Sequence, residues 1–287
     1  MSNTSEALDC LASYSKRVHT KVLSAHLLAI MTHLSRAQIF KLPPNGIVLS
    51  SEVRPDRPIM EMMERYDVPM RLPYGEIAIE FTHAMAGDGH GEPWSRCVCI
   101  ASDMRESGIF QDVVRARFLT DDCAGDGVVI TSVYFHSVMR VWIPNNYAML
   151  VKSTKCAYAI PLSEKAPNDF NRCALDLQIE LQSVVMLMTA LACSNVSAVS
   201  VEPSAALNKK RARSGKSPIR VHHVLVIGGD KSARKDSTAG SHASPRVHLR
   251  RGHIRRLESK NVWVNACVVG DKSRGVVTKD YRVQAVS

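Results

Sequence analysis

The hydrophobic pattern of the chain changes period along its length, and its first part is helical. Over residues 5–39 the apolar residues recur at spacings of three and four, with basic residues on the other face, which predicts two helices or one long helix. Two prolines and an Asn-Gly pair at 42–46 end this pattern, because proline lacks an amide donor and Asn-Gly favours a turn. A short helix is expected at 59–66, after Pro58.

From residue 72 the period becomes two, with many β-branched and aromatic residues. This pattern predicts an antiparallel meander, because alternate positions of a strand face opposite sides of a sheet. Six strands are expected, at 75–81, 95–102, 113–119, 127–135, 139–143 and 147–152. Turns between them are expected at 87–91, 121–127 and 144–146.

A long apolar helix follows the predicted sheet. Asp169 or Asn171 is suited to cap its N-terminus, and the pattern continues through 195. The second half is apolar on nearly every face, so we expect this helix to lie across the sheet at the centre of the core. The predicted fold class is therefore α+β, with N-terminal helices, an antiparallel sheet, a long core helix and a basic C-terminal hairpin.

The last third of the chain is read as a basic extension of this core. A basic loop at 208–218 precedes a strand at 219–228. Residues 229–245 are small, polar and charged, which is typical of a flexible linker. We expect a core domain at 1–205 and a basic C-terminal segment at 206–287 that completes the sheet.

The positive charge is concentrated in that segment. The net charge is +10, yet residues 206–282 hold 19 Lys and Arg against 5 Asp and Glu, which leaves 18 against 22 in the rest. A basic block of this size favours a partner that carries phosphates or an acidic protein surface. Charge alone does not distinguish the two.

The cysteines indicate a reducing compartment. The chain has 8 cysteines in apolar surroundings and no signal peptide at its start, so we expect free thiols in the cytoplasm of a host cell. Its longest apolar run, 184–193, is too short to span a bilayer. Cys97, Cys99, His83 and His90 lack the paired spacing of a zinc site, which favours buried strand cysteines.

No catalytic motif is recognisable, and one enzyme class stays open. Histidines among arginines are compatible with metal-independent RNA cleavage, in which a histidine acts as base and cations stabilise the transition state. The histidines in question are His222, His223, His248 and His253. A structural role for them is favoured, since alternate positions of a strand bring such side chains to the surface by default.

The most distinctive stretch is a predicted basic hairpin at 246–269, whose turn is expected at 258–261. Five arginines lie within residues 246–256. The strand period places Arg251, His253 and Arg255 on one face. It places Arg250 and Arg256 on the other. Such a row can follow phosphates or bind the carboxylates of a partner, although a solvated edge strand protected by charge is the simpler interpretation.

Two basic stretches, 208–227 and 247–271, together resemble a signature of phage and prophage proteins. The second contains His248-x-Arg250-Arg251-Gly252-His253 followed by a strand with Val262, Trp263 and Val264, and it resembles the C-terminus of a type V-A anti-CRISPR family. Members of that family suppress synthesis of the CRISPR effector nuclease by recognising its N-terminal nascent peptide and triggering decay of its message. The resemblance implies a similar regulatory role, with target recognition in the N-terminal two-thirds.

We therefore expect a phage-encoded anti-defence or regulatory binding protein that lowers expression of a host target. Its expected partner is a nascent peptide or host protein, with RNA or the ribosome as a further contact and no membrane, metal or cofactor. Two alternatives remain open: a metal-independent ribonuclease using His248 or His253, and a phage structural or assembly protein. The residues expected to bind nucleic acid or the partner are Lys209, Lys210, Arg211, Arg213, Arg250, Arg251, His253, Arg255 and Arg256.

Overall fold

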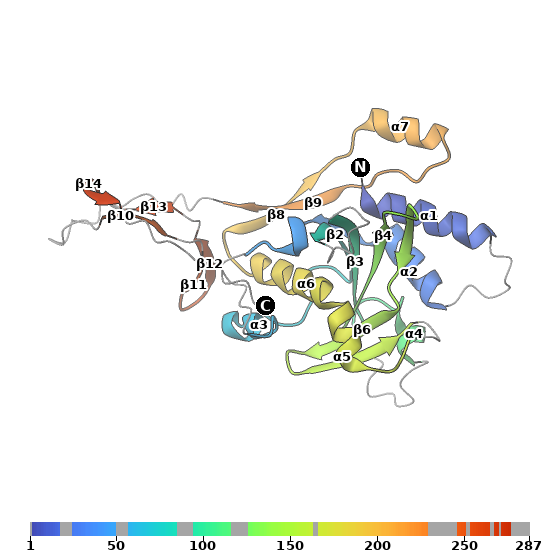
Figure 1. Cartoon of the computed structure of the whole chain (residues 1–287), viewed down its shortest axis with the longest axis horizontal. Coiled ribbons are helices and arrows are strands. Elements are labelled where there is room, and N and C mark those ends of the chain that lie inside the picture. Colours follow the sequence, from blue (N-terminus) through green and yellow to red (C-terminus); the bar gives the residue numbers. More distant parts are fainter. Residues whose placement is uncertain are drawn as a thin grey trace.

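The fold is an α+β arrangement around one large sheet, seen in a computed structural model (Figure 1). The described residues are 2–17, 25–49, 57–84, 94–115, 126–162, 166–228, 246–250, 253–264, 267–269 and 271–276. The helices are α1 (Asn3–Arg17), α2 (Ala25–Arg36), α3 (Glu61–Tyr66), α4 (Gln111–Arg115), α5 (Phe170–Asp176), α6 (Gln178–Leu191) and α7 (Ala205–Arg213), with one 3₁₀ turn, η1 (Pro44–Gly46). The predicted turn at 87–91, most of the one at 121–127 and the predicted linker at 229–245 lie outside the described residues.

The main sheet has nine strands and is mixed. Its strands are β1 (Gln38–Lys41), β2 (Glu76–Ala84), β3 (Trp94–Asp103), β4 (Val128–His136), β5 (Val141–Pro144), β6 (Tyr147–Ser153), β7 (Cys156–Pro161), β8 (Val196–Val201) and β9 (His222–Ile227). They follow the order β7-β6-β4-β3-β2-β1-β9-β8, with β5 paired to β4. Most neighbours are antiparallel, as predicted, but β1 runs parallel to both β2 and β9, which makes the sheet mixed.

Helices cover both faces of this sheet, because its central strands are apolar on both sides. On β2, Ile77 and Ile79 face a core shared with α3, α5 and α6, whereas Ala78 faces a second core shared with α1, α2 and α4. Continuous apolar runs of this kind are typical of strands buried on both faces. The result is a three-layer molecule with two hydrophobic cores (Figure 1).

Most predicted strands are confirmed, whereas β1, β7, β8 and β14 (Asp271–Val276) were not predicted. The predictions at 75–81, 95–102, 127–135 and 147–152 correspond to β2, β3, β4 and β6, and 139–143 to the shorter β5. The strand predicted at 113–119 is wrong in its first part. Residues there belong to α4, whose Val113 and Val114 are buried against the second core, while 116–119 lie outside the described residues.

The predicted core helix is two helices. Asp169 caps the first as expected, since its carboxylate accepts hydrogen bonds from the amides of Asn171 and Arg172. The chain breaks at Leu177, and α6 leaves α5 at an angle of 64°. The central residues of α6 are buried against the sheet, as predicted. No helix in the described ranges is by itself long and apolar enough to cross a membrane, although the bent pair α5–α6 passes on length and composition.

The basic C-terminal hairpin is present and has two parts. Strands β10 (Arg246–Arg250) and β13 (Cys267–Val269) form its far part, and β11 (His253–Arg256) and β12 (Asn261–Val264) form its near part. One register runs through both, from His248 opposite Val269 to Arg256 opposite Asn261. The last strand, β14 (Asp271–Val276), pairs with β10 away from the main sheet (Figure 1).

Candidate nucleic-acid interface

The basic stretch at 208–218, expected to be a loop, begins as the helix α7. Ser204 caps this helix, because its hydroxyl accepts a hydrogen bond from the amide of Leu207 at 3.4 Å. Alanine, leucine, lysine and arginine, which fill most of α7, are strong helix formers and explain why it is helical. No residue of α7 is buried, so the helix presents nearly its whole circumference to solvent.

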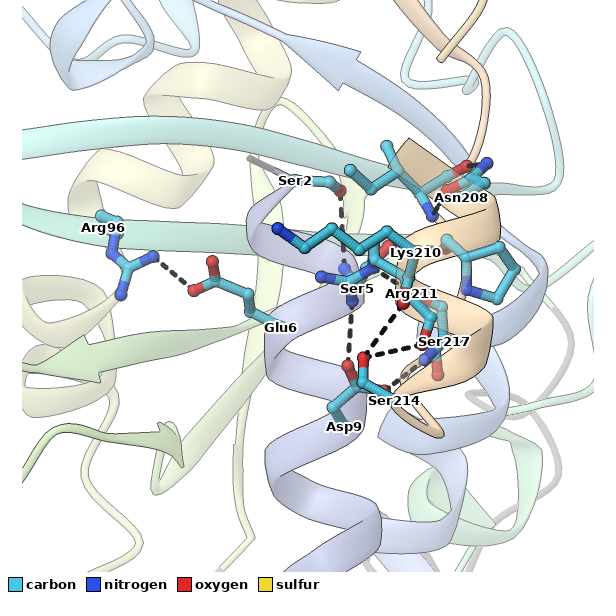
Figure 2. Close-up of polar contacts among 12 residues, drawn as sticks. Ser2, Ser5, Glu6, Asp9, Arg96, Asn208, Lys210, Arg211, Ser214 and Ser217 are labelled. Carbon is cyan, nitrogen blue, oxygen red and sulfur yellow. Dashed lines mark hydrogen bonds and ion pairs between the residues drawn. The ribbon is translucent and has the colours of Figure 1, made fainter. Parts of the chain in front are cut away.

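One arginine of α7 attaches the helix to α1. Arg211 places its guanidinium 2.9 Å from Asp9 and donates a second hydrogen bond to the carbonyl of Ser217 at 2.7 Å. Ser217 completes the triangle, since its amide donates to Asp9 at 2.8 Å (Figure 2). Arg211 is therefore a structural anchor whose charge is already paired with a carboxylate.

Two further contacts hold the loop after α7. Asn208 binds Ile219 in both directions, with its amide nitrogen on the Ile219 carbonyl at 2.9 Å and its oxygen on the Ile219 amide at 2.8 Å. Ser5 of α1 donates to the carbonyl of Pro218 at 2.9 Å. Because Glu6 of α1 in turn pairs with Arg96 of β3, α7 is fixed to the main sheet through α1 (Figure 2).

The cations of α7 that remain exposed are Lys209, Lys210 and Arg213, and Lys216 lies just beyond its end. Among the described residues, none of the four pairs with an acidic side chain, in contrast to Arg211. Three of them lie at or after the last turn, where positive charge is stabilised by the helix dipole. Lys216 belongs to the same basic stretch but was not among the predicted binding residues. Its exposure in the structure adds it to this surface.

The near part of the hairpin is fixed to the core by apolar and polar contacts. Ile254 is buried, and Trp263 packs against the first core. Asn195, which immediately precedes β8, donates to the Trp263 carbonyl at 2.7 Å and accepts from the Trp263 amide at 2.8 Å. Asn261 donates to the carbonyl of Tyr66 at the end of α3, at 2.8 Å.

Two of the hairpin arginines are exposed on this near part. Arg255 points to solvent on the face of β11 opposite to Ile254. Arg256 is also exposed and donates to the carbonyl of Arg65 at 3.1 Å. His248 and Arg250 belong to β10, where only the backbone is described, and Arg251 lies outside the described residues. Of the predicted row Arg251, His253 and Arg255, the structure therefore describes only His253 and Arg255.

The two basic segments lie at opposite ends of β8. The chain reaches α7 just after Val201, the last residue of β8, whereas the hairpin is clamped by Asn195 before its first residue. Figure 1 shows α7 and the pair β11–β12 on different sides of the molecule. The expected binding residues whose side chains the structure describes therefore lie on two separate positive surfaces, one around α7 and one on β11. The first, the α7 surface, comprises Lys209, Lys210, Arg213 and Lys216.

Of the histidines considered for catalysis, His222 and His223 lie apart from His253. His223 is buried, with its two ring nitrogens 3.3 Å from the Ser200 hydroxyl and 3.2 Å from the Gln38 amide oxygen, and it stacks on Tyr74. Burial lowers the pKa of His222 below its usual value, and the charge of Lys41 lowers it further. Both begin β9, whereas His253 lies on the hairpin beyond the other end of that strand. This separation favours structural roles for them.

The cysteines on β3 are buried, as expected. Cys97 and Cys99 both face the first core, and the Cys97 thiol lies 3.6 Å from the carboxyl group of Glu180 on α6. Burial raises the pKa of each thiol well above its usual value, and it also raises the pKa of Glu180. Within the ranges that the structure describes, no three His, Cys, Asp or Glu side chains are arranged to hold a metal ion.

Comparison with protein-family models, with curated proteins and with solved structures finds no match for this chain.

Proposed function

We propose that this chain is a phage-encoded regulatory binding protein that lowers expression of a host target in the host cytoplasm, and that its α7 surface contacts RNA. The observation that carries the RNA contact is the exposure of Lys209, Lys210 and Arg213 on a helix with no buried residue. Evenly accessible cations without acidic partners are suited to phosphates, whose binding is sequence-independent. The resemblance at 247–271 supports the regulatory role, in which the target is a nascent peptide or host protein.

Some polar residues of α7 fix the helix to the rest of the molecule while others are exposed, and this arrangement supports a binding role. Arg211 and Asn208 hold the helix in place, so the neighbouring lysines and Arg213 are presented from a fixed support rather than from a loose loop. A rigid support lowers the entropy cost of binding, because fewer backbone torsions must be ordered on contact. Aromatic side chains are absent from α7, so backbone phosphates rather than stacked bases are the expected contact.

The test is RNA binding by the variant Lys209→Ala/Lys210→Ala/Arg213→Ala, measured by fluorescence anisotropy with labelled single-stranded RNA over a range of salt. We expect weaker binding, and a plot of log affinity against log salt whose slope is shallower by about 2, since each lost phosphate contact contributes about 0.7 on single strands. Unchanged affinity and slope would show that α7 does not bind RNA.

The matched control is Arg71→Ala/Lys155→Ala/Arg172→Ala, which removes three positive charges that are ion-paired on the body of the molecule. A comparable loss in this control would assign the effect to net charge rather than to α7. The same RNA, incubated with the protein in a chelator and examined for cleavage, separates the binding role from the ribonuclease alternative. Intact RNA is expected, and cleavage that disappears in His253→Ala would favour the enzyme.

A further inference from the structure

Strand β8 forms the outer edge of the main sheet and lies between the two positive surfaces. It pairs with β9 on one side, and no strand among the described residues pairs with the other side of 196–201 (Figure 1). Nearly every residue of β8 is exposed, whereas β7 at the opposite edge lies against α5 and is half-buried or buried. An edge strand that is neither covered nor charged is open to pairing with a further strand.

The backbone of β8 offers hydrogen-bonding groups at this edge. The amide of Gly228 donates to the carbonyl of Asn195 at 2.8 Å, which makes these two residues a hydrogen-bonded pair. Pairs of this kind alternate along an antiparallel ladder. The amides and carbonyls of Ala198 and Ser200 are therefore directed away from β9, toward the free edge.

One face beside this edge is apolar and exposed. Val199 and Val201 of β8 share it with Val226 of β9, and the side chains of Val199 and Val226 are 44% and 43% exposed. In a strand added at the edge, alternate side chains would lie beside these valines. The face therefore fits a segment whose alternate residues are apolar.

Both ends of the edge are positively charged. At the first end, the amide of Ser194 donates to the carbonyl of Asn261 at 2.8 Å, and Asn195 binds Trp263 through both its amide groups. These bonds fix β12, and with it the exposed Arg255 of its partner strand β11, just before β8. The α7 surface follows the other end of β8 directly.

The charges of the edge identify its occupant. Glu202 is the only charged residue within 191–206, so the edge is neutral between its two basic ends. Six residues of strand span about 20 Å, more than the Debye length of about 8 Å in physiological salt, so each end attracts acidic side chains independently. A second copy of this chain fits poorly, because pairing in either direction brings a basic segment of one copy to a basic end of the other. RNA fits the middle poorly, because the valines offer its phosphates no cation.

On the basis of the proposed function, in which the target is a nascent peptide or host protein, we propose that the β8 edge binds an extended segment of that target with acidic residues at both ends. Between them lie about six neutral residues, alternately apolar. The segment adds a strand to the sheet through the outward amides and carbonyls of Ala198 and Ser200, with its apolar side chains beside Val199. Its acidic ends meet Arg255 and the α7 surface. Addition of a strand to an exposed edge is a general mode of peptide recognition.

Three labelled peptides test the chemistry of the occupant by fluorescence anisotropy. They are EETVTVTEE, its lysine counterpart KKTVTVTKK, and EETVTVTEE with its central amides N-methylated. We expect the first to bind, the second to bind at least about tenfold more weakly because four charges are reversed, and the third not to bind because strand pairing needs its amides. Equal binding of the first two would contradict charge selection. Binding that survives N-methylation would contradict a strand at the edge.

Variants of the chain test the place. Ala198→Pro removes an amide that β9 does not use, and proline is tolerated on the open side of an edge strand. It should abolish binding of EETVTVTEE, and Val199→Ser should weaken it by about fivefold through lost apolar contact. The matched control is Val226→Ser, which makes the same change at the same exposure one strand farther from the edge and should bind nearly as the parent does. Circular dichroism checks that all three are folded, and equal binding by Val199→Ser and the parent overturns the site.

The two basic ends are tested separately. Arg255→Ala and the α7 variant Lys209→Ala/Lys210→Ala/Arg213→Ala should each weaken binding of EETVTVTEE by about threefold, as expected for exposed ion pairs. The ion-paired control variant described above should not. Losses of equal size in that control would mean that net charge, rather than the ends of β8, attracts the peptide.

RNA binding and molecular mass distinguish this proposal from the proposed function and from other occupants. A parent chain that binds RNA but none of the peptides overturns the peptide site and leaves the RNA contact standing, whereas peptide binding without RNA binding does the reverse. Loss of RNA binding in Ala198→Pro would place nucleic acid at the edge. A parent chain that is a dimer by light scattering and becomes a monomer in Ala198→Pro would place a second copy there. Either result overturns the proposal.

Discussion

His33 is fully buried between α2 and the sheet, with its Nε2 on the carbonyl of Ile77 at 2.8 Å. Burial is the main cause that lowers its pKa from 6.5 to about 4, against the opposing effects of the Ile77 carbonyl and Glu76. The folded protein therefore holds this imidazole neutral over a pH range in which the unfolded chain protonates it. Its hydrogen bond to Ile77 requires the proton on Nε2.

Between pH 6.5 and about 4 the unfolded chain binds a proton that folded His33 does not, so the free energy of unfolding should decrease as pH falls through this window, by on the order of 3 kcal/mol from His33. Below the folded pKa the contribution should level off. Urea unfolding of the parent chain and of His33→Gln at several pH values isolates it, because other buried groups titrate in both proteins. Parallel pH profiles for the two would contradict this account.

Gly46 in η1 has a φ of +66° and faces α6. A Cβ atom at this position would lie 2.4 Å from Cβ of Ser183 and 2.9 Å from its Cα. Gly46→Ala should therefore lower the free energy of unfolding by about 2 kcal/mol or more, through backbone strain and overpacking. Gly215 has φ of +64° and nothing within 4 Å of such an atom, so Gly215→Ala isolates the strain alone and should cost about 1 kcal/mol. Equal losses would remove the packing argument.

At the level of elements, the near part of the hairpin depends on Asn195. Its side chain makes both a donated and an accepted hydrogen bond with Trp263. Asn195→Ala should lower the protection of amides at 253–264 against hydrogen exchange by about 1 to 2 kcal/mol, because two bonds to one strand are lost. Asn195→Asp keeps the oxygen that accepts from the Trp263 amide, so its protection should lie between that of the parent chain and that of Asn195→Ala. Protection that is unchanged in both variants would mean that Ile254 and Trp263 fix the hairpin without this clamp.

Elements were predictable where one local signal dominated. The strands β2 and β3 were predicted correctly because their apolar residues recur with a period of two and pack into the two cores. The start of α5 was predicted correctly because Asp169 is a strong N-cap. The helix α7 was missed because its charges and the following Ser-Gly pair favour a loop, although Ser204 and the helix-forming residues pointed to a helix. The strand β1 was missed because its four residues directly follow α2 and continue an apolar pattern.

At the level of the whole molecule, the sheet order was beyond sequence reasoning for a physical reason. The parallel pairs of β1 join segments far apart in the chain, Ile39 with His222 and Phe40 with His223, and no local periodicity encodes such pairs. The basic surfaces were predictable as composition, yet their separation by the length of β8 was not. The role of Arg211 also depended on a distant residue, Asp9, so its pairing was visible only in three dimensions.

The parallel position of β1 has a consequence for the order of events during synthesis. β1 emerges from the ribosome early and finds β2 soon after, but its second neighbour, β9, is made much later. Asp9 is also made early, whereas Arg211, with which it forms an ion pair, is made much later. Until residues 205–227 have been translated, one edge of β1 stays unpaired and Asp9 of α1 lacks Arg211, so folding is completed late. The segment that carries the basic helix is also the one that completes the sheet, so a chain that presents α7 in place has already folded.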